Sequence, residues 1–208
     1  MAETLFRQWF GESEKLKMKS EKLGNVIQTT SGGTPSRSNA EYFSNGNIRW
    51  VKSKELNSTY IFETEEMITE DALKNSSAKL IPANSILIAM YGATVGEFGI
   101  LGNEATCNQA ICALIPNENY PFTYLFLLTK FNKENLLNLA GGSAQQNISQ
   151  LLIKDLDVSS EKKLVQEFHK QTEPYFQKIK SNTIQIKTLQ QTRDSLLPKL
   201  MSGEVRVN

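Results

Sequence analysis

Histidine and cysteine are scarce in this chain of 208 residues, and their scarcity limits the chemistry that the chain can support. One histidine, His169, and two cysteines, Cys107 and Cys112, are present. These three residues cannot complete a four-ligand zinc site without several carboxylates. We therefore expect no metal site, interpret the cysteines as buried free thiols, and interpret His169 as a surface or packing residue of a helix.

Signatures of catalysis and of nucleotide binding are also missing. The sequence contains no phosphate-binding GxxxxGK[ST] loop, no dinucleotide-binding GxGxxG loop, no HExxH, and no Asn/Asp-Pro-Pro-aromatic signature of amino-methyltransferases. We therefore expect no catalytic residue and no cofactor, and predict that the protein is not an enzyme by itself.

Long hydrophobic runs and a secretory leader are missing as well. No apolar stretch approaches the ~20 residues that span a bilayer. At the N-terminus, charged residues interrupt the apolar ones of MAETLFRQWF, and no small-residue cleavage site follows. The sequence therefore predicts a cytoplasmic protein with no membrane association, which suits free cysteines.

The composition is that of an ordinary globular protein, but its charge is unevenly distributed. Hydrophobic residues make up 39% and charged residues 22% of the chain, and the net charge is +1. From Lys15 to Lys54 there are eight basic and two acidic residues, a difference of +6, whereas the stretch from Glu55 to Asp71 is purely acidic. Either a solvated charge run or a surface for a polyanion explains this segregation.

The chain divides into three parts that differ in the spacing of their apolar residues. Residues 1–20 contain AETLFRQWF, in which Leu5 and Trp9 are spaced as on one face of a short amphipathic helix, followed by a linker. Residues 21–158 form the globular part. Residues 159–208 contain a long helix and a C-terminal tail.

Short apolar runs separated by Gly, Asn, Ser and Pro fill the middle part, and this pattern indicates β-structure. The runs are GNVIQTT, NIRWVK, AKLIPANSILIAMYG, FGILG and ATCNQAICALIP. One helical stretch, TYLFLLTKFNKENLLNLA, interrupts them. The sequence therefore predicts an α+β fold, in which a mixed globular domain precedes a long coiled-coil-forming helix.

An alternating three-four spacing of residues runs from Val165 to Leu200 and is typical of a coiled-coil seam. Because a proline inside a helix removes a hydrogen bond, Pro174 predicts a kink or a restart near Glu173, with an uninterrupted helix from there to about Leu197. Such a helix is longer than a small domain needs, so it separates or joins other parts.

Two interpretations of the long helix are open: a core helix folded back on its own domain, or one strand of a helix pair. The polar seam residues Thr172, Asn182 and Arg193 favour a specific partner helix whose register they help to set. The residues expected at this interface are Tyr175, Ile179, Asn182, Ile186, Leu189 and Leu196.

Four blocks in this order resemble the specificity subunit of type I restriction-modification enzymes. They are GNVIQTTSGGTPSRSNAEYFSNGNIRWVKSKEL, LIPANSILIAMYGATVGEFGILGNEATCNQAICALIP, LAGGSAQQNIS and the long helix that ends in LQQTRDSLLPKLMSGEVRV. In that family a subunit carries two target-recognition domains, each followed by a long helix, and the helices pair antiparallel. This chain has one of each, and AETLFRQWF resembles the tail after such a helix. The resemblance implies either the second half of a full subunit or a naturally half-sized subunit.

The resemblance implies that loops of the domain read base edges in the major groove of double-stranded DNA. In GGTPSRSN, Arg37 has the planar fork that bonds guanine, while Asn and Gln side chains suit adenine. Lys22, Lys52 and Lys54 would contact phosphates. Purely structural roles stay open for Asn108, Gln109 and Tyr91. The candidate DNA-binding residues are Thr34, Ser36, Arg37, Lys52, Lys54, Tyr91, Thr94, Asn108, Gln109, Gln145, Gln146 and Asn147.

The implied partners are DNA, methyltransferase subunits, a restriction subunit and a second copy of this chain. In a homodimer with antiparallel helices, Asn182 should lie close to the two-fold axis, and the segment from Leu5 to Phe10 should pack on a long helix. Two other interpretations remain open. The chain could be the target-recognition domain of a type II adenine DNA methyltransferase system, or a coiled-coil adaptor that binds only protein.

Overall fold

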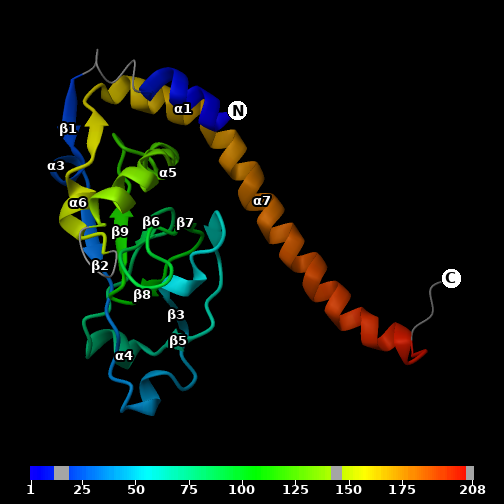
Figure 1. Cartoon of the computed structure of the whole chain (residues 1–208). Coiled ribbons are helices and arrows are strands. Elements are labelled where there is room, and N and C mark those ends of the chain that lie inside the picture. Colours follow the sequence, from blue (N-terminus) through cyan, green and yellow to red (C-terminus); the bar gives the residue numbers. More distant parts are fainter. Residues whose placement is uncertain (12–18, 142–146, 205–208) are drawn as a thin grey trace.

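A five-stranded sheet forms the centre of the molecule (Figure 1). The computed structural model describes residues 1–11, 19–141 and 147–204. The strand order is β2-β9-β6-β7-β4, and all neighbours are antiparallel except β4 and β7. The strands are β2 (Gln28–Ser31), β4 (Tyr60–Ile61), β6 (Ile86–Ala89), β7 (Phe98–Leu101) and β9 (Ile111–Ile115).

Both faces of this sheet are buried. Successive residues of a strand point to opposite faces, so each strand contributes to two apolar clusters. In β6, Ile86 and Ile88 pack into the larger apolar cluster with the helices, whereas Leu87 and Ala89 pack into a second cluster. The second cluster also contains Val51 of a smaller sheet. The central strands are therefore continuous apolar runs, and the predicted strand in SILIAMYG is confirmed.

The smaller sheet has three strands in the order β5-β3-β8. The central strand is parallel to β8 and antiparallel to β5. Its Trp50 is buried and meets Phe43 edge to face at a centroid distance of 5.9 Å. The strands are β3 (Ile48–Val51), β5 (Met67–Ile68) and β8 (Thr106–Cys107). The 3₁₀ turns beside them are η1 (Ala40–Tyr42) and η2 (Ser53–Glu55).

The remaining strands, β1 (Ser20–Lys22) and β10 (Asp157–Ser159), pair antiparallel at the other end of the domain. Among the described residues, three short helices connect the strands. They are α3 (Leu23–Val26), α4 (Glu70–Lys74) and α6 (Gln150–Lys154). The prediction of β-structure for all of GNVIQTT was wrong in its first half, because α3 forms one helical turn there and β2 begins only at Gln28.

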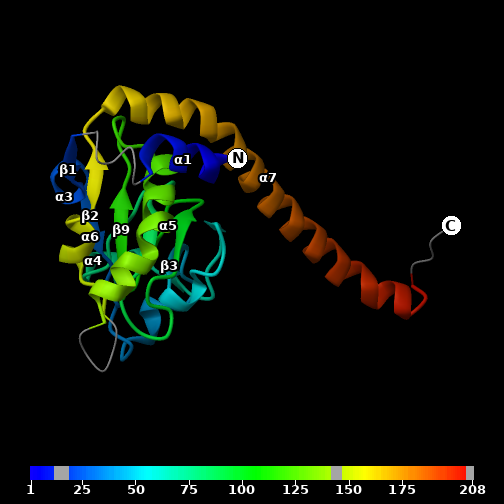
Figure 2. The same ribbon diagram turned by 45° about the horizontal axis from the view of Figure 1, so that its top comes forward.

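Two longer helices, α1 (Ala2–Phe10) and α5 (Phe122–Leu139), pack together with the beginning of α7 (Lys162–Met201) (Figure 2). Phe6 and Phe10 of α1 are buried and lie 5.7 and 5.3 Å, by ring centroids, from Phe168 of α7. The predicted amphipathic helix is confirmed, and it packs on the long helix of its own chain.

Helix α7 is 40 residues long and extends away from the domain (Figure 1). Both Pro174 and Pro198 lie inside it, so the helix does not restart near Glu173 and does not end near Leu197. The ribbon bends where the helix leaves the domain, as a proline that removes one backbone hydrogen bond allows (Figure 2).

The first part of the predicted seam packs on the chain's own domain and is not available to a partner helix. Val165, Phe168 and Thr172 are fully buried against the chain's own domain. The hydroxyl of Thr172 donates to the carbonyl oxygen of Phe168 at 2.8 Å, so its polar atom is satisfied within the helix. The expectation that Thr172 sets the register of a partner helix was therefore wrong.

Candidate nucleic-acid interface

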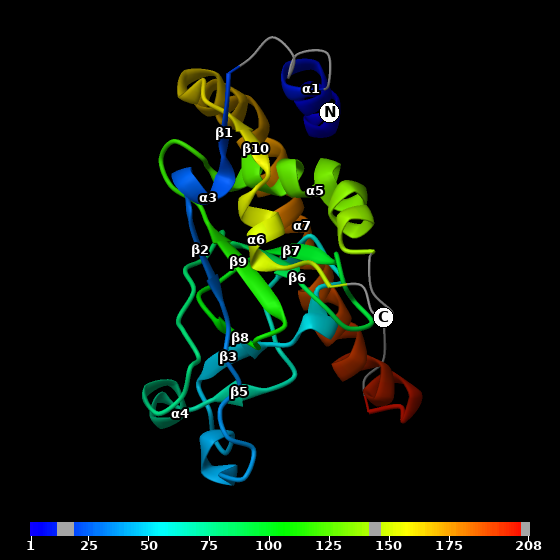
Figure 3. The same cartoon turned by 60° about the vertical axis from the view of Figure 1, so that its left-hand side comes forward.

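The candidate DNA-binding residues gather where β2 and β6 end and β9 begins. These ends share one edge of the sheet because β9 is antiparallel to both neighbours, with Ser31 opposite Cys112 and Ala89 opposite Ile111 (Figure 3). The loops after β2, after β6 and before β9 therefore lie together. We call this edge the candidate interface.

Close backbone contacts hold two of these loops together. The amide of Gly33 donates to the carbonyl oxygen of Cys107 at 2.9 Å, and the indole Nε1 of Trp50 donates to the carbonyl oxygen of Gly33 at 2.9 Å. A Cβ atom at Gly32 would lie 2.0 Å from the carbonyl oxygen of Cys107. Only glycine fits at position 32, which explains the Gly pair in GGTPSRSN.

Side chains from these two loops also meet. The hydroxyl of Thr34 donates to Oε1 of Gln109. The amide of Asn108 donates to the carbonyl oxygen of Val51 at 2.9 Å, while its side-chain Oδ1 is buried with no hydrogen-bond partner in the part of the chain that the structure describes. Residues 34 and 109, which are far apart in the sequence, thus form one polar surface.

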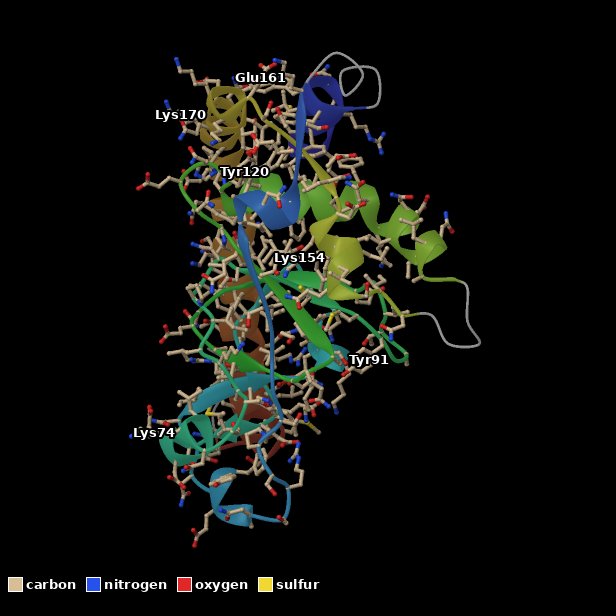
Figure 4. All side chains as sticks on the ribbon, turned by 90° about the vertical axis from the view of Figure 1, so that its left-hand side faces the viewer. Lys74, Tyr91, Tyr120, Lys154, Glu161 and Lys170 are labelled. Atoms are coloured by element: carbon tan, nitrogen blue, oxygen red, sulfur yellow. The ribbon has the colours of Figure 1, made fainter. Side chains whose placement is uncertain are left out.

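A third loop and the segment before α6 join the same edge. Tyr91 pairs with Asn147 through an isolated antiparallel bridge, and the amide of Ile148 donates to the carbonyl oxygen of Met90 at 2.7 Å. Tyr91 is 36% exposed, so it is not a core residue. Figure 4 shows it far from Glu161 at the start of α7.

Of the other candidates, Thr94 lies in the turn between β6 and β7, where its carbonyl oxygen accepts from the amide of Glu97 at 2.9 Å. Ser36 is exposed, and its hydroxyl lies 2.7 Å from that of Ser38. The expected base contacts Gln145 and Gln146 lie outside the described residues.

Arg37 is held in place by three neighbours. Its Nη1 lies 2.6 Å from Oε2 of Glu66, and its guanidinium carbon lies 4.2 and 4.9 Å from the ring centroids of Phe43 and Trp50. The side chain is still 53% exposed. A guanidinium that is stacked and exposed is oriented before it meets a ligand. This support could not be predicted from the sequence, because Glu66 and Phe43 belong to other segments.

The two lysines that were expected to contact phosphates are paired with carboxylates. Lys52 Nζ lies 2.8 Å from both Glu65 Oε2 and Glu66 Oε1, and Lys54 Nζ lies 2.7 Å from Glu65 Oε2. The hydrogen bonds from Lys52 and Lys54 lower the pKa of Glu65 to about 2. The Lys52 side chain is only 15% exposed, whereas that of Lys54 is 59% exposed. Lys54 is thus the more accessible cation.

These pairs show that the acidic stretch folds back on the basic one. The separation of charge along the sequence is largely cancelled in space at the candidate interface. Lys22, a further expected phosphate contact, lies at the opposite end of the domain, where its Nζ is 3.4 Å from Asp155 and 3.0 Å from Asp157. Its pairing with β10 makes it a structural residue.

The two cysteines and the histidine, which could be reactive, are packed against other parts of the domain. Cys107 and Cys112 are free and buried, as predicted, and burial raises the pKa of each thiol to about 12. His169 packs between α7 and α5, with Nδ1 3.0 Å from the hydroxyl of Thr123, and burial lowers its pKa. The described ranges contain no group of three His, Cys, Asp or Glu side chains that could hold a metal ion.

Within residues 1–11, 19–141 and 147–204, none of the helices combines the length and the apolarity that a bilayer span requires. The molecule combines a polar edge built from several loops, an oriented arginine and a helix that projects from the domain. Together they define a class of protein: a globular α+β domain mounted on a long helix.

Sequence comparison identifies the family. The family described as "Type I restriction modification DNA specificity domain" matches residues 15–160, and the chain belongs to this family. It shares 29% identity over 191 residues with the HindI specificity subunit of Haemophilus influenzae, covering 88% of this chain and 40% of that protein. With the MjaIX specificity subunit of Methanocaldococcus jannaschii it shares 28% identity, covering 98% of this chain and 52% of that protein.

Solved structures have the same fold. The S subunit of the type I restriction-modification system from M. genitalium matches with a TM-score of 0.66 at 16% identity, covering 95% of this chain and 49% of that one. The HsdS subunit from Thermoanaerobacter tengcongensis matches with a TM-score of 0.58 at 15% identity, covering 98% and 50%. These matches confirm the mixed α+β domain with its long helix. The chain spans about half the length, or less, of these relatives.

Proposed function

We propose that this chain is a DNA sequence-recognition subunit of a type I restriction-modification system, and that it reads one half of a bipartite target. The observation that carries the proposal is the candidate interface. There, three loops from one sheet edge present an arginine, amides and hydroxyls whose donors and acceptors match those of base edges in the major groove.

Each group at the interface has a distinct role in this proposal. Arg37 gives up its contact with Glu66 and forms hydrogen bonds to guanine. During this exchange the stacked aromatic rings keep the guanidinium group in place. Asn108 and Gln109, which suit adenine, lie on the neighbouring loop. Lys54 contacts a phosphate, which positions the duplex without reading sequence.

The proposal includes partners but no catalysis by this chain. The methyltransferase and restriction subunits would carry out methylation and cleavage of the DNA. The candidate interface of this chain would bind the DNA through non-covalent contacts. A second copy of the chain would contribute a second candidate interface for the other half of the bipartite target. The exposed residues Ile186 and Leu189 on the outer part of α7 support an antiparallel helix pair. Asn182 would then lie near the two-fold axis.

The test of recognition is a comparison of two substitutions. Arg37→Ala should cost ~1–3 kcal/mol of binding to the target and leave binding to unrelated duplexes almost unchanged, because a base contact is lost. Lys54→Ala should weaken binding to all sequences equally. Both are measured by fluorescence anisotropy at several salt concentrations, and urea unfolding of each variant checks that the fold is intact.

The target itself comes from mapping methylated bases in cells that express the chain with its methyltransferase. A two-fold dimer predicts an inverted repeat with a non-specific spacer between its halves. Unchanged discrimination by Arg37→Ala would remove Arg37 from the base-reading set, and a wild-type chain that binds no duplex would refute the proposed function.

A further inference from the structure

A pocket of about 320 Å³ lies between the domain and the middle of α7. The domain contributes residues of β3 and of the segment after β4, and the helix contributes the residues that face the domain. The charged side chains that line the pocket are Arg49 of β3, Glu63, and Lys180 and Lys187 of α7. The pocket is therefore built from two elements that only the tertiary structure brings together.

Positive charge is in excess in this pocket. Lys187 is in contact with the carboxylate of Glu63. In the part of the chain that the structure describes, neither Arg49 nor Lys180 forms an ion pair. Three cations thus share one carboxylate, which leaves a formal charge of +2 at one place.

Hydrogen-bond donors are in excess there as well. The Nε of Arg49 is buried and has no hydrogen-bond partner among the described residues, although buried polar groups are normally paired. Burial and the nearby charge of Arg49 lower the pKa of Lys187, so that the two cations disfavour each other. An anion with several acceptor oxygens would satisfy both the unpaired donor and the unbalanced charge.

We propose that this pocket binds one phosphate group of the DNA backbone, with Arg49, Lys180 and Lys187 as donors. The inference rests on the proposed function. A guanidinium fork suits a phosphate, and the pocket has room for one with some of its water, since a water in liquid occupies about 30 Å³.

Position in the fold favours DNA as the source of the phosphate. The pocket adjoins the candidate interface through a single short segment, because Glu63 lies in the pocket while Glu65 and Glu66 pair with the cations of the interface. A backbone phosphate held there would set the register of the duplex over the loops. Because its donors belong to both the domain and α7, a bound phosphate would also tie the helix to the domain.

The experiment compares Lys180→Gln with Lys178→Gln, using the full chain. Both substitutions remove one lysine from α7, but Lys180 is half-buried and lines the pocket, whereas Lys178 is exposed and does not line it. The slope of log K against log salt concentration is measured for duplex DNA. Lys180→Gln should reduce the magnitude of the slope by about one, because one phosphate contact is lost, and Lys178→Gln should keep the wild-type slope. Equal slopes for the two variants would overturn the inference.

Inorganic phosphate serves as a second probe of the same pocket. The melting temperature is measured in sodium phosphate and in sodium chloride of equal ionic strength, and phosphate should stabilise wild type and Lys178→Gln more than Lys180→Gln. Stabilisation by phosphate with equal DNA slopes would mean that the pocket binds free phosphate only, which contradicts the inference as stated. A failure of wild type to bind any duplex would instead refute the proposed function and, with it, this role of the pocket.

Discussion

The two halves of α7 carry the same three-four spacing of apolar residues and have opposite surroundings. In the first half, Val165 and Phe168 are 0% exposed and Phe176 is 2% exposed. In the second half, Ile186 is 56% and Leu189 is 68% exposed. The helix between them is continuous. The spacing therefore predicts an apolar stripe, but it does not predict what covers the stripe.

The outer half also has two distinct faces. Lys180, Ile184 and Lys187 line the pocket against the domain, and Ile186 lines a neighbouring pocket between the helix and the domain. At 3.6 residues per turn Leu189 lies on the opposite side of the helix from Lys180, Ile184 and Lys187, so a partner helix at Leu189 would not displace the domain from that pocket. One half of α7 is thus a core helix, and we propose that the other half is an interface.

The largest expected effect is the loss of dimerisation when the seam carries charge. Ile186→Glu with Leu189→Glu should convert a dimer of twice 23.4 kDa into a monomer. Each buried side chain lost from the seam weakens the free energy of association by roughly 2 kcal/mol. Since two copies are affected, association should weaken by more than about a thousandfold. Light scattering at micromolar concentration measures the mass.

The matched control places the same charges on other faces of α7. Gln177→Glu with Ser181→Glu should leave the mass at that of a dimer, because neither residue belongs to the seam. A wild-type chain that is a monomer, alone and with methyltransferase, would contradict the dimer and remove the distinction between the two halves of the helix.

The second effect concerns the covered half. Phe168→Ala should lower the free energy of unfolding by ~3–5 kcal/mol, because it opens a cavity among Phe6, Trp9 and Phe10. Leu189→Ala on the same helix should change the stability of the domain very little. Urea unfolding followed by tryptophan fluorescence measures both. Equal losses for the two variants would show that the halves do not differ as described.

The smallest expected effect tests the acidic segment, which pairs with Lys52 and Lys54 at the surface of the domain. The hydrogen bonds from Lys52 and Lys54 lower the pKa of Glu65 from its ordinary 4.5 to about 2. A carboxyl group with a lowered pKa stabilises the fold above its unfolded pKa, and this contribution is lost as the pH falls towards 2. The melting temperature should therefore rise from pH 2 to pH 5.

Glu65→Gln should reduce this rise in melting temperature. The control substitution Glu118→Gln, on an exposed loop, should leave the rise unchanged. Because Glu65 lies at the surface, the difference should be small and should decrease further in high salt. Identical pH profiles for Glu65→Gln and wild type would show that these ion pairs contribute nothing to stability.

The strands that could be predicted from the sequence are those with several consecutive apolar residues. The runs that became β6, β7 and β9 are long enough to show a pattern, and so is the helical run that became α5. The two-residue strands β4 and β5 are too short to carry any periodicity, so they were not predicted. The turn of α3 was mistaken for a strand because Val26 and Ile27 also suit β-structure.

Contacts at the candidate interface were less predictable than its location. Glycine pairs and polar residues beside strands indicated which loops to consider. They did not indicate that Thr34 would bond Gln109, or that Lys52 would be mostly buried between Glu65 and Glu66. Such pairs join residues that lie well apart in the sequence, and their geometry depends on how strands align across a sheet.

By itself, the sequence determined the order of the parts, the main strands, the long helix and the scarcity of metal-binding residues, because these depend on composition and local periodicity. Only the tertiary structure decided that the first part of the seam, from Val165 to Thr172, belongs to the core and that Arg37 stacks on Phe43 beside Glu66. It also decided that Arg49 faces Lys180 and Lys187 across a pocket. The physical reason is that burial and ion pairing depend on which segments meet, and neither is a local property of the chain.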